Sequence, residues 1–271
     1  MSTVKLNYGN SQYLLSTKMQ SFPLLAKLLN KTIGYTNIGN YARSKVFKKH
    51  LGQLDLNSMQ NILDLGCGYG ENAIMVAKGL PGKNVYALDI DKDALNRVKF
   101  AKDTLQINNL ILHEGKIDTM REEQFDLIYS VDVFEHIPME EMPFSDAFKK
   151  LKPGGFMLVK IPNKIQYTIL NEKYFTEHNK WVDHEHPGQV YLLEDLEERF
   201  KKEGFKIHFS SQTDGKFSRM AWELAYFTKK AGSIAQLISL PFCKLLVNLD
   251  QLIYSNGTSR GNAITVIGQK A

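Results

Sequence analysis

The chain has 271 residues, 43% of them hydrophobic and 23% charged, which is the balance of an ordinary globular domain. Its 34 basic and 29 acidic residues give a net charge of only +5, and the basic residues come in pairs. Without a long basic run, the sequence argues against a DNA-binding protein. Two cysteines without metal-type spacing exclude a disulfide framework and predict a cytoplasmic protein.

Targeting and membrane signals are weak. The segment after Met1 lacks the charged-then-apolar layout of a signal peptide. The longest uncharged apolar stretch, 232–243, falls short of the roughly 20 residues that a membrane-spanning helix needs. We therefore expect no membrane-spanning segment, and peripheral membrane contact stays open.

The first half of the chain changes its pattern near residue 60. Before that point short amphipathic helices are expected, because Phe22, Leu25 and Leu28 fall on one helical face. Apolar strand-like runs then alternate with helical patterns, as in a parallel sheet wound with helices. The glycines after Pro153 are expected to end the last intervening helix. The runs lie at 61–65, 84–90, 110–113, 125–131 and 155–161.

The second half predicts a helix over 192–202, a strand over 205–210 and a last strand over 263–268. The segment between these two strands has helical periodicity. The fold class predicted is α/β, with a doubly wound and mainly parallel sheet of seven strands. We divide the chain into an N-terminal helical extension (1–58), an α/β core (59–211), a helical insertion (212–262) and the final core strand (263–271).

The sharpest local motif is a glycine-rich turn directly after the first strand. Gly66, Gly68 and Gly70 follow the apolar run 62–65, and a helical pattern starts at Glu71. Glycine suits a turn with unusual backbone angles that a ligand must approach closely. Asp89 ends the next strand, where a carboxylate can accept both hydroxyls of a ribose.

The spacing of the turn bears on which ribose-bearing ligand it binds. The dinucleotide fingerprint needs a third small residue three positions after its second glycine. Here Glu71 occupies that position and would repel a pyrophosphate. S-adenosylmethionine (SAM) contains no pyrophosphate, so the motif favours SAM over NAD.

Residues 62–163 resemble the class I SAM-dependent methyltransferases. The run 62–70 is similar to the first motif of that family, and Asp89 to its ribose-binding acid. The segments 125–128 and 151–155 are similar to the fourth-strand motif and to the turn before the fifth strand. The resemblance implies a Rossmann-like fold, SAM as the cofactor and methyl transfer as the activity.

The same resemblance implies a set of cofactor-binding residues. The three glycines would lie under the methionine part of SAM, Ile90 would pack on adenine, and 115–117 would line the adenine edge. Lys116 departs from the pattern, because many members have aspartate there. The cofactor-binding set is Asp64, Gly66, Cys67, Gly68, Gly70, Asp89, Ile90, Lys116, Ile117, Ser130 and Val131.

Candidate catalytic residues follow the fourth strand and recur near residue 185. Asp132, Glu135 and His136 are spaced so that one helical turn brings them together. This D-x-x-E-H pattern is similar to that of ubiquinone-type O-methyltransferases and small-RNA 2′-O-methyltransferases, which can hold a divalent metal. In the RNA enzymes a downstream histidine completes the site, and His184 or His186 would match it. Trp181 and Tyr191 flank these two histidines.

We predict methylation of an oxygen on a small, lipid-like or sugar-like acceptor. Glu135, His136, His184 and His186 are the catalytic candidates, and no residue is assigned as a metal ligand. Two alternatives remain open: an RNA 2′-O-methyltransferase with a divalent metal, and a SAM-binding regulatory protein without catalysis. The acceptor's identity and the oligomeric state are left open.

Overall fold

The computed structural model describes residues 6, 12–121, 124–186, 188 and 190–271, without the side chains of Asp183 and Glu185. Seven strands form one sheet in the order β3-β2-β1-β4-β5-β7-β6. Its neighbouring strands are parallel, except that β7 runs antiparallel to β5 and β6. The predicted seven-stranded, mainly parallel sheet is confirmed. The strands are β1 (Asn61–Leu65), β2 (Asn84–Asp89), β3 (Leu110–Glu114), β4 (Phe125–Val131), β5 (Leu151–Pro162), β6 (Phe205–Thr213) and β7 (Ala263–Lys270).

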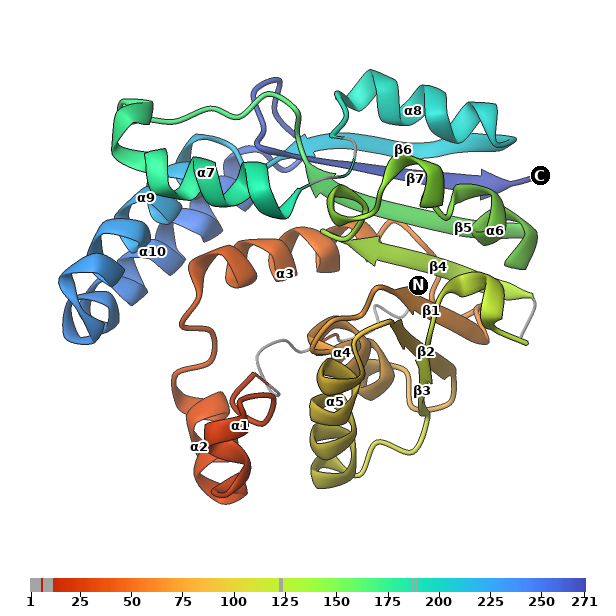
Figure 1. The fold of residues 1–271 in the computed structure, drawn as a ribbon, viewed down its shortest axis with the longest axis horizontal. Helices are drawn as coiled ribbons and strands as arrows, with labels where there is room; N and C mark the ends of the chain where they lie inside the picture. Colours follow the sequence, from red (N-terminus) through yellow and green to blue (C-terminus); the bar gives the residue numbers. More distant parts are fainter. Residues whose placement is uncertain (1–5, 7–11, 122–123, 187, 189) are drawn as a thin grey trace.

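Helices cover both faces of this sheet (Figure 1). The α-helices are α1 (Thr17–Gln20), α2 (Pro23–Thr32), α3 (Ile38–Leu51), α4 (Glu71–Gly79), α5 (Lys92–Leu105), α6 (Phe144–Lys150), α7 (Thr176–Glu185), α8 (Leu193–Lys202), α9 (Lys216–Ala231) and α10 (Ser233–Ile253). Short 3-10 helices are η1 (Ile117–Thr119), η2 (Phe134–His136), η3 (Met139–Glu141) and η4 (Glu172–Phe175).

The core consists of two apolar layers because side chains alternate between the faces of each strand. Ile62 of β1 packs in the layer that α3, α4 and α5 cover, whereas Leu63 packs in the layer under α6 and α8. A smaller cluster joins Ile38 and Ala42 of α3 to α9 and α10. The N-terminal region is thereby attached to the helices that precede the last strand.

The carboxyl edge of the sheet carries most of the added structure. The arrowheads of β4 and β5 point toward the side where α3, α7, α9 and α10 lie (Figure 1). The segment expected to be helical, 212–262, contains α9 and α10, and α9 begins three residues after the end of β6. Open α/β sheets bind ligands at this edge.

Several predicted bounds were wrong by one to four residues, and β6 and β7 extend to Thr213 and Lys270. β5 begins at Leu151 rather than at residue 155, because the chain pairs with β4 on both sides of an irregularity opposite 125–127. The apolar stretch 232–243 was expected to be too short to span a membrane. It belongs to α10, which has 21 residues. It is long and apolar enough to cross a membrane by length and composition. The helix continues through the charged residues Lys244 and Asp250, so it is longer than the uncharged stretch 232–243 on which the expectation was based.

Asp250 fastens α10 to the start of α9. This buried carboxylate accepts hydrogen bonds from the backbone N–H groups of Gly215 and Phe217 and from the Ser218 hydroxyl, each at 2.9 Å. Buried donors without acceptors destabilise a fold. Asp250 therefore holds both helices in one orientation relative to the sheet.

Replacing Asp250 by alanine should lower the free energy of unfolding by about 1–3 kcal/mol, because it leaves three buried donors without their acceptor. Urea denaturation followed by circular dichroism measures the change. Asp103→Ala, at an exposed position of α5, is the matched control and should stay close to the wild type. Equal stability of the two variants would contradict the anchoring role.

Candidate active site

The glycine-rich turn between β1 and α4 has the conformation that its sequence predicts. Gly66 and Gly70 have positive φ angles of 76° and 72°. A Cβ atom on Gly66 would lie 2.4 Å from Val133 Cγ1, and one on Gly70 would lie 2.5 Å from Val98 Cγ2. Glycine is therefore required at both positions by backbone angle and by space.

The turn is pinned to the end of β2. The N–H groups of Gly66 and Cys67 both donate to the Leu88 carbonyl at 2.9 Å. Asp89 accepts from the Gly68 N–H at 2.6 Å and from the Asp91 N–H at 2.9 Å. The carboxylate predicted to bind ribose thus lies directly beside the glycine turn.

A cavity of about 230 Å³ opens beside the same turn. Of the predicted cofactor set, its lining includes Asp64, Gly66, Cys67, Gly68, Gly70 and Val131. A second group comes from the segment at the start of α3 and was missed by sequence analysis: Tyr35, Asn40, Arg43 and Ser44. No local motif marks these residues, because they reach the turn only when the N-terminal region folds over the sheet.

The remaining members of the cofactor set are not in the lining of this cavity. Ile90 is 72% exposed next to Asp89, which leaves an apolar surface for a planar ring. Ile117 is buried in η1, and Ser130 is buried with its hydroxyl donating to the Leu65 carbonyl at 2.9 Å. Lys116 forms an ion pair with Glu141. The binding roles of all these residues stay predictions.

Two carboxyl groups in the cavity have raised pKa values. Burial raises the pKa of Asp64 to about 8, with a hydrogen bond to Tyr129 acting in the opposite direction. Burial also raises the pKa of Glu71 to about 7, and Tyr35 and Arg43 oppose that rise. The cavity therefore carries less negative charge near neutral pH than its sequence suggests, and it can bind a carboxylate-bearing ligand with less repulsion.

Asp132 connects the cavity to the carboxyl ends of β4 and β5. It forms ion pairs with Arg43 of α3 and with Lys160, whose Nζ lies 2.9 Å from Asp132 Oδ1. Burial alone would raise the pKa of Asp132, but the Arg43 and Lys160 charges keep it below its ordinary value. The carboxylate predicted to join Glu135 and His136 is instead neutralised by two cations.

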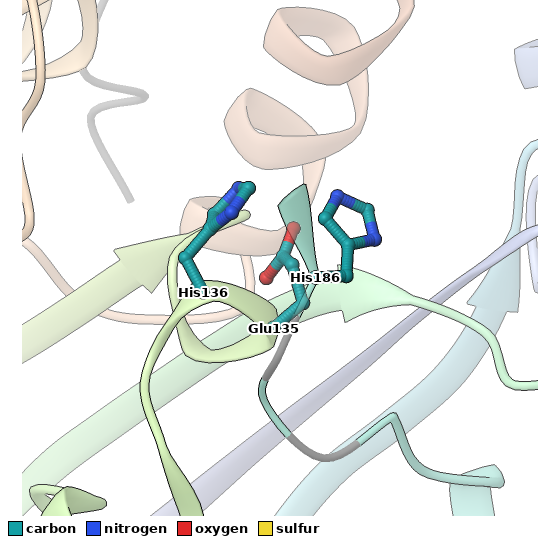
Figure 2. Close-up of side chains that lie close together, drawn as sticks. All are labelled: Glu135, His136 and His186. Atoms are coloured by element: carbon teal, nitrogen blue, oxygen red, sulfur yellow. The ribbon is translucent and has the colours of Figure 1, made fainter. Parts of the chain in front are cut away.

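Glu135 and His136 of η2 meet His186 at the end of α7 (Figure 2). Their potential ligand atoms lie within 4.8 Å of one another, and the two imidazole rings are 4.8 Å apart between centroids. Glu135 is buried, which raises its pKa to about 8, and the Asp132 charge adds to that rise. Two imidazoles and a carboxyl group can act as an acid–base set or hold a divalent cation.

A glycine lets the chain after α7 approach η2 closely. The Gly188 N–H donates to the Glu135 carbonyl at 2.9 Å. A Cβ atom at this position would lie 2.6 Å from the carbonyl oxygens of Phe134, Glu135 and Ile137. Any larger residue would push this chain, and His186 with it, away from η2. Sequence analysis missed Gly188 because its role depends on a long-range contact.

The other residues proposed near this group, Trp181, His184 and Tyr191, differ in their exposure. Trp181 is 54% exposed, and its ring centroid lies 6.1 Å from that of His186. His184 is exposed in the last turn of α7, outside the group of three. Tyr191 is largely buried in the layer under α8 and also lines a separate cavity beside Met142 and Arg199.

Comparison with protein families identifies the domain that contains this cavity. A family model described as a methyltransferase domain matches residues 38–208, which is more than half of the chain. The chain belongs to the class I SAM-dependent methyltransferases. The match begins at Ile38, the first residue of α3, so the helix that lines the cavity is included.

Individual relatives of this methyltransferase differ in their acceptors. It is 30% identical over 173 residues to phosphoethanolamine N-methyltransferase 2 of Caenorhabditis elegans, covering 61% of this chain and 36% of that one. It is 27% identical to the ubiquinone biosynthesis O-methyltransferase of Hydrogenovibrio crunogenus, covering 56% and 66%. The chain spans between 24% and 42% of the length of the phosphoethanolamine N-methyltransferases that it matches.

Solved structures support the fold of this methyltransferase. Phosphoethanolamine N-methyltransferase 2 of Haemonchus contortus, in complex with phosphomonomethylethanolamine and S-adenosylhomocysteine, superposes with a TM-score of 0.58 at 20% identity. The similarity covers 90% of this chain and 59% of the other. At this identity it establishes the fold alone, so the acceptor must be inferred from the site.

Replacing Asp89 by alanine should weaken SAM binding by about 1.5–3 kcal/mol, the value of a hydrogen bond to a charged group. Isothermal titration calorimetry with SAM measures the loss. Asp93→Ala, at an exposed position four residues away, is the control and should bind SAM as the wild type does. Undiminished affinity in the Asp89 variant would remove this residue from the cofactor site.

The raised pKa values of Asp64 and Glu135, each about 8, predict how stability changes with pH. Between the unfolded-state pKa near 4 and the folded-state value, the folded chain holds protons that the unfolded chain has released. The part of the free energy of unfolding that these two groups contribute should therefore fall as pH rises from about 4 to about 8. Buried His50, whose pKa is lowered to about 3, acts in the opposite direction below about pH 6.5, so the decline should be clearest above pH 6.5.

Asp64→Asn should flatten this decline, because an amide cannot lose the proton. Urea denaturation of the protein without ligand, at about pH 6 and about pH 8, measures the slope. Asp93→Asn is the control and should keep the slope of the wild type. An Asp64→Asn variant with the same slope would show that this carboxyl group is ionised in the folded protein.

Proposed function

We propose that this chain methylates an oxygen of a small, lipid-like or sugar-like acceptor, with His136 as the group that accepts the acceptor's proton. The observation that carries the proposal is the meeting of Glu135, His136 and His186 within 4.8 Å at the carboxyl edge of the sheet. Bound SAM supplies an electrophilic methyl group. The protein must then align the acceptor with that methyl group and remove the hydroxyl proton.

The cavity beside the glycine turn supports the binding of SAM. The glycine turn leaves its backbone open at Gly68, where a Cβ atom would have no neighbour within 4 Å. Asp89 and the exposed Ile90 offer an acceptor for ribose hydroxyls and an apolar surface for adenine. Since both positions match the family motif, the residues present fit SAM.

The site supports oxygen chemistry because it contains a histidine next to a carboxyl group with a raised pKa. Imidazole is the side chain best suited to accept a proton near neutral pH. A protonated Glu135 does not compete with His136 for that proton. An amine that is already deprotonated needs no such base, whereas a hydroxyl does.

A row of rings supports an acceptor with an apolar or sugar-like part. From His186 it passes to Trp181 at 6.1 Å, then to His178 at 5.8 Å and to Trp222 of α9 at 4.8 Å between centroids. Aromatic faces pack well on apolar rings and on the apolar faces of sugars. Tyr226 stacks on Trp222, and Lys230 lies over the Tyr226 ring, already paired with Glu177.

One observation favours a second candidate, a metal-dependent 2′-O-methyltransferase acting on RNA. Glu135, His136 and His186 supply the oxygen and nitrogen donors that divalent transition metals accept. A bound cation would draw the proton from Glu135 and lower the pKa of the acceptor hydroxyl. The two candidates differ in their requirement for a metal.

His136→Ala should lower kcat by about 10²–10⁴-fold, because the acceptor keeps its proton without the imidazole. SAM affinity should stay nearly unchanged. Transfer of radiolabel from SAM to hydroxyl acceptors, with phosphoethanolamine as the amine competitor, measures turnover. His208→Ala, at an exposed position of β6, is the control and should keep wild-type kcat.

Unchanged turnover in His136→Ala, or methylation of phosphoethanolamine alone, would contradict the proposal. Loss of activity in EDTA that Mn²⁺ restores would favour the metal-dependent candidate instead.

A further inference from the structure

Helix α10 exposes an apolar face along most of its length. The structure describes all of α10, and its exposed side chains are apolar apart from Ser233 and Asn248. The exposed large apolar residues are Ile234, Leu237, Ile238, Phe242, Leu245, Leu252 and Ile253. Ile234 and Ile238 are 78% and 75% exposed. We refer to these seven residues as the α10 face.

The opposite side of α10 is packed against the protein. Leu240, Cys243, Leu246 and Val247 are buried in the cluster with α3 and α9. Asp250 is also buried and holds three donors at the start of α9. To cross a bilayer, α10 would have to abandon these contacts and move a carboxylate into lipid, which is costly. The helix is therefore suited to lie along a membrane surface rather than to span it.

Helix α2 carries further exposed apolar side chains and is connected to α10 by the segment that follows it. The segment that follows it lies along α10, because Gln236 donates to the Thr36 carbonyl and Lys244 to the Ile33 carbonyl. On α2 itself Leu24 is 80% exposed and Leu28 is 56% exposed. In Figure 1, α2, α9 and α10 lie on the side of the molecule that carries the carboxyl ends of the strands.

The exposed charged side chains of α2, and those at the end of α9 next to α10, are basic. Lys27 and Lys31 are exposed on the same side of α2 as Leu24 and Leu28, and Lys229 is exposed just before α10. The sequence from residue 12 to residue 54 contains no aspartate or glutamate. In α9 and α10 the acidic residues are Glu223 and Asp250, and both are buried. Apolar side chains flanked by exposed lysines match the surface of an anionic bilayer.

We propose that the α10 face and α2 bind an anionic lipid bilayer surface, so that this methyltransferase takes its acceptor from the membrane. This inference rests on the proposed function. Among the acceptors proposed there, it favours a lipid-like one. The row of rings from His186 to Trp222 reaches α9, which packs directly on α10. An acceptor with a buried apolar tail could thus present its hydroxyl head to His136 while its tail stays in the bilayer.

A second copy of the chain fits the same surface less well. Symmetric pairing of two α10 faces would bring the lysines of both copies close together, and like charges repel. Anionic lipid instead neutralises them. The charge pattern therefore favours a bilayer over self-association.

Flotation of the full chain with vesicles tests the proposal. We expect binding to vesicles of phosphatidylcholine mixed with phosphatidylglycerol, and at least tenfold weaker partitioning to vesicles of phosphatidylcholine alone. The double variant Ile238→Ser/Phe242→Ser should lose at least tenfold in partitioning to the anionic vesicles. Met139→Ser, which alters an exposed apolar residue of η3, is the matched control and should bind as the wild type does.

Other results would overturn the proposal. One is a wild-type chain that does not bind anionic vesicles. Another is a double variant that binds these vesicles as the wild type does, with an unchanged melting temperature and SAM affinity. Sedimentation that shows a wild-type dimer, which the double variant dissociates, would assign the face to self-association. Vesicle binding requires no methyl transfer, so its failure is distinguishable from failure of the proposed reaction.

Discussion

The buried charge cluster around Asp132 is the interaction on which the site depends most. It joins the end of β4, where Asp132 adopts a positive φ of 53°, to Lys160 of β5 and Arg43 of α3. Lys160 has only 5% of its side chain exposed, so losing its partner would leave an uncompensated buried charge, at a cost of about 3–5 kcal/mol. The cluster fixes α3 over the cofactor cavity and fixes the start of η2. Both halves of the proposed reaction therefore depend on one carboxylate.

Asp132 also influences the protonation of Glu135 and, through it, the role of His136. Because Asp132 stays ionised between two cations, its negative charge raises the pKa of Glu135 further than burial alone would. A neutral Glu135 leaves His136 as the base. A cation bound between the two residues would instead make both of them ligands, with Glu135 ionised. The charge cluster thus links the geometry of the sheet to the question of metal dependence.

Sequence alone predicted the repeated and local features, because these depend on periodicity and on backbone constraints. The seven strands, the glycine turn and the position of Asp89 belong to this group. It could not predict that Asp132 pairs with Arg43, 89 positions earlier, since no spacing rule connects them. The approach of Gly188 to η2 required the fold itself.

We propose that one edge of the sheet presents SAM to the group formed by Glu135, His136 and His186. A crystal structure of the chain with S-adenosylhomocysteine tests it most directly. We predict that the ribose hydroxyls contact Asp89 and that the sulfur faces His136 across the carboxyl end of β4. A ligand whose sulfur points away from η2, or that binds outside the cavity beside the glycine turn, would contradict the account.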